Sequence, residues 1–105
     1  MRILQDSDVL EELILLAGYI NDDNEEAAHR FLDACDATFQ FLAENRYVGA
    51  GKPFSNPELQ DVKMWRVKGF EKHLIFYKPL EDGVRILHLV HSARDWRGLF
   101  DDEAR

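Results

Sequence analysis

The feature that most constrains the fold of this 105-residue chain is a change in the spacing of its apolar residues near Val62. Before Val62, apolar residues recur every three to four positions, as they do on the buried face of an amphipathic helix. After it, they alternate with polar residues or form short apolar runs, as in β-strands. Helices followed by strands predict an α+β domain in which the helices cover one face of a sheet.

Two helices are expected in the first half of the chain. Residues 7–20 form the first helix, with Asp6 or Ser7 as its N-cap, and residues 25–44 form the second. The polar residues 21–24 separate them, and such a short link makes an antiparallel helical hairpin. Residues 45–61 contain two glycines and two prolines, which predicts a long loop with at most one helical turn.

The second half predicts a three- to four-stranded antiparallel sheet. Its strands cover residues 62–70, 72–80 and 84–91, and Asp82-Gly83 is a strong hairpin signal between the last two. Residues 2–5 could add an edge strand, and Gly69 is expected in a turn. The C-terminal residues predict a short final helix capped near Ser92. We expect residues 1–105 to form a single domain.

The net charge of −7 comes from the first half of the chain. Residues 1–46 hold 11 acidic and 3 basic residues, whereas residues 47–105 hold 9 and 10. An acidic protein is a poor non-specific ligand of nucleic acid, although a local basic surface in the second half remains open. The single cysteine, Cys35, excludes an internal disulfide. Since neither a leader-like start nor a membrane-length apolar run is visible, a cytoplasmic protein is expected.

No cofactor or metal site is expected from the pattern. His88 and His91 are three residues apart on a predicted strand, so their side chains point to opposite faces. Cys35 lies on the apolar stripe of the second helix, where a small buried thiol is the ordinary role.

One segment resembles a known family. The residues LIFYKPLEDGVRILHLVHSARDW, at 74–96, are similar to the C-terminal signature of the RelE/ParE toxin superfamily. The preceding strand, VKMWRVKGF, matches the family strand that carries an arginine, here Arg66. The order of hairpin, loop and sheet also follows the family. His-x-Ala-Arg-Asp at positions 91–95 favours the ParE-like branch.

The resemblance implies the toxin of a type II toxin–antitoxin system, associated with plasmid stabilisation and neutralised by a cognate antitoxin. ParE-like members are typically described as inhibitors of DNA gyrase, whereas RelE-like members bind the ribosome and cut mRNA. The ParE-like activity is the expected one here, through gyrase or another protein target. A ribosome-dependent mRNA endonuclease is the first alternative, and an inactive binding module of the same fold is the second.

RNA cleavage would need clustered cations and an acid or base near the scissile phosphate. Only Arg66, His91 and Arg94 could supply such a catalytic set in this chain. The net charge, the acidic tail and His88, where the family commonly has arginine, all argue against RNA chemistry. The structural alternatives are that His91 caps the end of the sheet and that Arg94 pairs locally with Asp95.

The antitoxin is expected to dock on exposed apolar residues of the hairpin, the loop and the sheet edge. Phe41 is informative because it falls off the main apolar stripe of the second helix. Arg66 and Arg94 could meet carboxylates of this partner. Both a homodimer and a hetero-oligomer with the antitoxin are left open. The expected antitoxin-binding residues are Leu10, Leu13, Phe39, Phe41, Tyr47, Phe54, Arg66 and Arg94.

Overall fold

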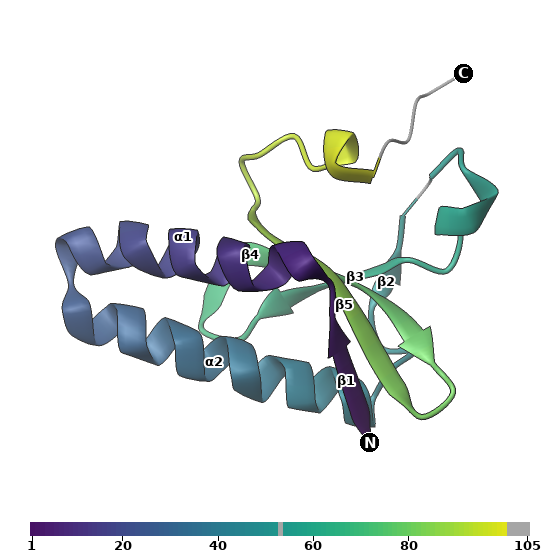
Figure 1. The fold of residues 1–105 in the computed structure, drawn as a ribbon, viewed down its shortest axis with the longest axis horizontal. Coiled ribbons are helices and arrows are strands. Elements are labelled where there is room, and N and C mark those ends of the chain that lie inside the picture. The colour runs from purple at the N-terminus through teal and green to yellow at the C-terminus, as the bar shows by residue number, and fades with distance from the viewer. Residues whose placement is uncertain (53, 101–105) are drawn as a thin grey trace.

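The computed structural model describes residues 1–52 and 54–100 and confirms the α+β class. Strand β1 precedes two long helices, and the remaining strands and two short 3₁₀ helices follow (Figure 1). The elements are β1 Arg2–Gln5, α1 Ser7–Asp23, α2 Glu25–Glu44, β2 Ala50–Gly51, η1 Pro57–Leu59, β3 Lys63–Val67, β4 Phe70–Leu80, β5 Gly83–His91 and η2 Arg97–Phe100.

Helices α1 and α2 form the predicted hairpin. Helix α2 has the predicted bounds, whereas α1 continues past residue 20 to Asp23, so Asn24 alone separates the helices. The Asn24 side chain accepts the Ala27 N–H at 3.0 Å, while its own N–H donates to the Ile20 carbonyl at 2.9 Å. Asn24 therefore ends one helix and caps the next, which allows the sharp reversal.

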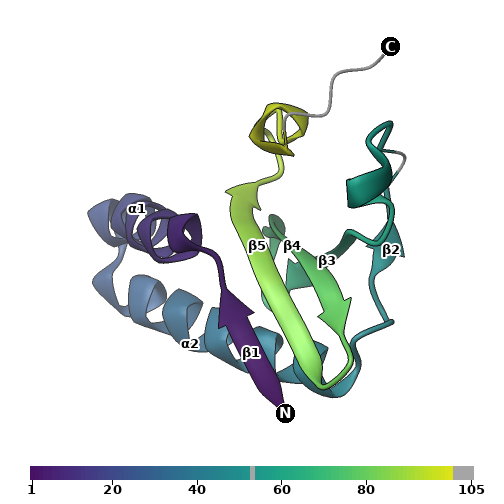
Figure 2. The ribbon, with the colours of Figure 1, turned by 45° about the vertical axis from the view of Figure 1, so that its right-hand side comes forward.

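The sheet has five strands in the order β1-β5-β4-β3-β2 (Figure 2). Strands β3, β4 and β5 form the predicted antiparallel meander, and the chain turns between the first two at Gly69, whose φ is +83°. The prediction was wrong in two details: β2 is an extra short strand, and β1 pairs with β5 in parallel. The sheet is therefore mixed, because a four-residue edge strand carries no signal for its direction.

Apolar side chains fill both faces of the sheet. The helix-side core lies under α1 and α2 and is built around Phe31, Phe39, Ile75 and Tyr77. Burial there raises the pKa of the Cys35 thiol to about 12, as expected for a structural cysteine.

The far-side core lies on the opposite face, beneath the loop that contains η1 and the segment after β5. Its buried members are Phe54, Val62, Leu74, Phe76, Leu87 and Val90, with Trp96 and Phe100 packed against them.

The C-terminal helix is shorter and begins later than predicted. A turn follows β5, in which the Arg94 N–H donates to the His91 carbonyl at 3.0 Å, and only residues 97–100 are helical, as η2. The rest of the predicted helix, residues 101–105, lies outside the described residues. Within the described part of the chain, no helix is long and apolar enough to cross a membrane.

Candidate partner-binding groove

The structure places Arg66 and His91, two of the three residues that RNA cleavage would have to bring together, on opposite faces of the sheet. Paired residues of neighbouring antiparallel strands share a face, and Arg66 is opposite Leu74, which is opposite Val90 in the far-side core. His91 is opposite His73, whose ring packs at 4.8 Å on Phe31 in the helix-side core. Arg66 and His91 thus belong to opposite faces and to strands separated by β4, so they do not converge on one phosphate.

His91 has the local role of capping the end of the sheet. Its Nδ1 accepts the Ala93 N–H at 3.1 Å, so Nδ1 is the unprotonated nitrogen in the neutral ring. The ring also meets His73 edge to face at 5.3 Å. Burial lowers the pKa of His73. The contact with the Phe70 backbone acts in the opposite direction and raises the pKa, whereas the nearby His91 lowers it further. Arg94 is exposed in the turn that His91 supports.

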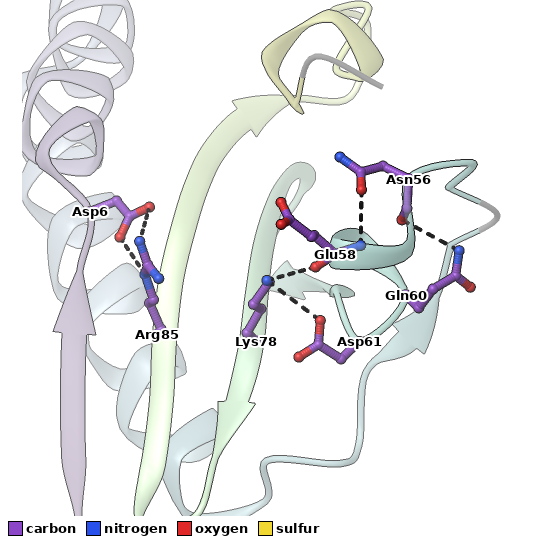
Figure 3. A network of polar contacts seen from close by, with 7 residues as sticks. All are labelled: Asp6, Asn56, Glu58, Gln60, Asp61, Lys78 and Arg85. Carbon is purple, nitrogen blue, oxygen red and sulfur yellow. Dashed lines mark hydrogen bonds and ion pairs between the residues drawn. The ribbon is translucent and has the colours of Figure 1, made fainter. Parts of the chain in front are cut away.

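Two cations on the sheet are bound by local carboxylates (Figure 3). Arg85 of β5 pairs with Asp6 at 2.7 Å, which fastens the β1–α1 junction to the sheet. Lys78 of β4 donates to the Glu58 carbonyl at 2.8 Å and lies 3.6 Å from the Asp61 carboxylate. Lys78 therefore holds the η1 loop in place and offers little free charge to an RNA backbone.

The far side of the sheet is also closed by aromatic packing. Trp96 lies 5.0 Å from Phe76 and 5.6 Å from Phe54, measured between ring centroids. Phe100 is 5.1 Å from Phe54 and 5.3 Å from Phe76. These contacts join the η1 loop to the C-terminal segment over the sheet, so an RNA strand could reach this face only after they open.

A groove of about 920 Å³ lies between α2 and the β3 edge of the sheet. Phe41 projects from α2 and stacks on Trp65 of β3, with ring centroids 5.8 Å apart and planes 25° apart. Arg66 and Lys68 lie at the strand side of the groove. We call this feature the edge groove; its walls include Ala37, Phe41, Val48, Ala50, Trp65 and Arg66.

The expected antitoxin-binding residues do not form one surface. Phe41, which is 41% exposed, and Arg66 meet in the edge groove. Leu10 is exposed on α1, which packs against β5 nearer the other edge of the sheet, and Leu13 is partly buried against the helix-side core. Tyr47 is exposed in the loop after α2, beneath the guanidinium of Arg46.

The expectation of exposure was wrong for two of these residues. Phe39 is 2% exposed, because its place on the α2 stripe faces the sheet. Phe54 is 4% exposed, because its ring packs edge to face against Trp96 and Phe100 in the far-side core. Neither side chain can anchor a partner in this conformation. Sequence reasoning also missed the stacking partner of Phe41, since Trp65 is far from it in the chain.

A buried polar contact that the sequence did not reveal joins α1 to the edge of β5 beyond β1. Glu12 accepts the Leu89 N–H at 2.8 Å with one oxygen and bonds His88 Nδ1 at 2.7 Å with the other. Burial alone would lower the pKa of His88. The hydrogen bond and charge of Glu12, with the charges of Asp8 and Asp6, outweigh burial and raise the pKa.

This pairing predicts a loss of stability as the pH rises. A raised folded-state pKa means that the stabilisation is complete below the ordinary value of 6.5 and is lost as the pH rises through the folded value. Chemical denaturation from about pH 6 to about pH 8.5 should show this fall for the native chain. Glu12→Gln should flatten it, because the amide keeps an acceptor for Leu89 but carries no charge. An equally steep fall in the Glu12→Gln variant would contradict the assignment.

A model of a known protein family matches nearly the whole chain. A family model described as "ParE toxin of type II toxin-antitoxin system, parDE" matches residues 3–96. The match includes all of β1 but its first residue, both helices, all strands of the meander and the turn after β5. No curated protein matches the sequence.

Proposed function

The chain belongs to the ParE toxin family of type II toxin–antitoxin systems, and on that premise we propose that it stops growth by binding a host protein. DNA gyrase is the first candidate target, as the ParE-like resemblance implies. The observation that favours a protein target over RNA cleavage is the placement of Arg66 and His91 on opposite faces of the sheet. A cytoplasmic location, where gyrase and a newly made antitoxin are found, is part of the proposal.

Two further features support this choice. In-line cleavage of RNA requires stabilisation of charge on one phosphate by groups that converge on it. Lys78 and Arg85 are bound by Asp61 and Asp6, and the far side of the sheet is covered by Trp96 and Phe100. Protein recognition has no need of a prepared phosphate site, and the edge groove supplies apolar surface with the charged residues Arg66, Lys68 and Glu71 at its margin.

The test is to induce the chain alone in a bacterial host. Inhibition of gyrase predicts filamentous cells and induction of the DNA-damage response while translation continues. Co-expression of the product of the adjacent reading frame, as the antitoxin, should restore growth. Gly83→Ala, which is expected to open the pairing of β1 with β5, controls for the burden of expression.

The other outcomes each identify a different function. An immediate stop in translation with cleaved mRNA would contradict the proposal and support the ribosome-dependent endonuclease. Normal growth with soluble, folded protein would contradict it and support an inactive binding module of the same fold.

A further inference from the structure

The end of the sheet where β4 begins and β5 ends holds two histidines side by side. His73 and His91 are directly opposite one another, because a register shift in the pairing of β4 with β5 brings them into alignment. Both rings line a cavity of about 520 Å³ between the sheet and the junction of α1 with α2. This cavity shares no lining residue with the edge groove.

The His91 ring holds the turn that follows β5. Its Nδ1 accepts the Ala93 N–H at 3.1 Å, which is the one side-chain hydrogen bond to residues 92–95 in the described part of the chain. Beyond this turn, residues 96–100 pack over the far-side core through Trp96 and other apolar side chains. We call residues 96–100 the C-terminal cover. The His91 ring thus links the end of the sheet to the start of the cover.

The bond to Ala93 exists only while His91 is neutral. The neutral ring carries its proton on Nε2, so the next proton adds to Nδ1. An imidazolium ion has two N–H donors and no acceptor, and its Nδ1–H would oppose the Ala93 N–H, which is also a donor. The loss of a hydrogen bond of ordinary strength changes an equilibrium by roughly tenfold. Acid therefore favours a turn that has moved away from the ring.

His73 responds to acid in the same direction. Its Nδ1 is buried and makes no hydrogen bond of good geometry, although the Phe70 backbone is close enough to act on its pKa. Burial lowers the pKa of His73, so the closed arrangement loses stability as the pH falls from the ordinary value of 6.5 through the folded value. Since the two ring centroids are only 5.3 Å apart, a charge on either ring also opposes a charge on the other.

The charged groups around the pair come from three elements. Asp23 and Tyr19, on the last turns of α1, line the same cavity, and the Asp23 carboxylate favours protonated rings. Arg94 and Asp95 in the turn are exposed and carry opposite charges, and the Lys72 side chain of β4 is exposed as well. Asp23 is therefore the group that makes protonation of the pair easier.

His88 also touches the cover, but it acts in the opposite sense. Its ring meets that of Phe100 with centroids 5.1 Å apart. Its raised pKa means that its pairing with Glu12 is complete at low pH and is lost as the pH rises. An opening of the cover in acid therefore cannot come from His88.

We propose that His73 and His91 form an acid-sensitive latch, and that their protonation releases the C-terminal cover from the far side of the sheet. Release exposes apolar side chains that the cover packs against, among them Phe76 and Leu87. The latch is a property of this chain alone and does not depend on the target that the toxin binds.

The test follows the native chain from about pH 7.5 to about pH 5, the range in which histidine side chains titrate. Amide exchange at Leu99, whose N–H donates to the Trp96 carbonyl at 3.1 Å, should become about tenfold faster after correction for its intrinsic pH dependence. Far-UV circular dichroism should stay constant, and the change should reverse at pH 7.5. Unchanged exchange at Leu99, or a loss of circular dichroism in step with faster exchange, would overturn the latch.

Matched variants assign the response to the pair. In His91→Asn, the amide oxygen can accept the Ala93 N–H in place of Nδ1 but does not titrate, so the cover should stay closed in acid. Asp23→Asn should move the opening to lower pH. Glu12→Gln, which alters only the His88 contact, should keep the native response. An acid response that persists in His91→Asn, or that disappears in Glu12→Gln, would contradict the assignment.

Discussion

Replacing Gly83 by alanine is expected to detach β1 from the sheet and to destabilise the protein by about 3 kcal/mol or more, the upper range for overpacking. A Cβ on Gly83 would overlap the Arg2 carbonyl oxygen and lie within 3 Å of two further Arg2 backbone atoms. Backbone cannot move aside as a flexible side chain can. The parallel pairing of β1 with β5 must therefore open, and the start of α1 moves with it.

Gly51→Ala is the matched control. Gly51 is also in a strand, but a Cβ there would meet no atom within 4 Å, so the variant should change stability by less than about 1 kcal/mol. Chemical denaturation of both variants measures the difference. Hydrogen exchange should locate the damage in Gly83→Ala at β1 and the paired part of β5. Similar stability of the two variants would show that β1 does not approach β5 this closely.

The substitution Phe76→Ala is expected to cost about 3–5 kcal/mol, the range for removing a fully buried aromatic ring. Phe76 is 0% exposed and contacts the rings of Trp96 and Phe100 from the middle strand of the meander. Its loss should destabilise the domain and also release the C-terminal segment from the far side of the sheet. A red shift of Trp96 fluorescence, measured in a Trp65→Phe background, would report that release.

Phe41→Ala provides the comparison for this prediction. The Phe41 ring is 41% exposed and has Trp65 as a stacking partner on the groove side, so about 1 kcal/mol is expected for its removal. Thermal unfolding of the two variants separates a core residue from a surface anchor. If Phe76→Ala unfolded at the same temperature as Phe41→Ala, the far-side core would contribute less to the stability of the protein than its burial implies.

Most of the fold could be predicted from local patterns. The α2 bounds followed from its apolar stripe and the polar link before it, and the β4–β5 hairpin followed from Asp82-Gly83 between two apolar runs. The direction of β1 could not be predicted, because parallel and antiparallel edge strands have the same short pattern. The end of α1 was missed because residues 21–23 are all polar, so the apolar pattern does not show that the helix continues through them. The helix ends only at the Asn24 cap.

The candidate site was predictable only in part. Arg66 and Phe41 were singled out by type and position, and they do line one groove. Phe39 and Phe54 resembled exposed anchors because a sequence does not reveal which side of a helix or loop another segment will cover. The pairing of His73 with His91 depends on a register shift between β4 and β5, a relation that local periodicity does not carry.

The measurement that tests the central claim most directly is DNA supercoiling by purified gyrase in the presence of the purified chain. Action on a protein target, with gyrase as the first candidate, predicts that the chain inhibits supercoiling in proportion to its concentration. Addition of its antitoxin should restore the activity. Full supercoiling activity at concentrations of the chain that stop growth, together with mRNA cleaved at the ribosome, would contradict the account.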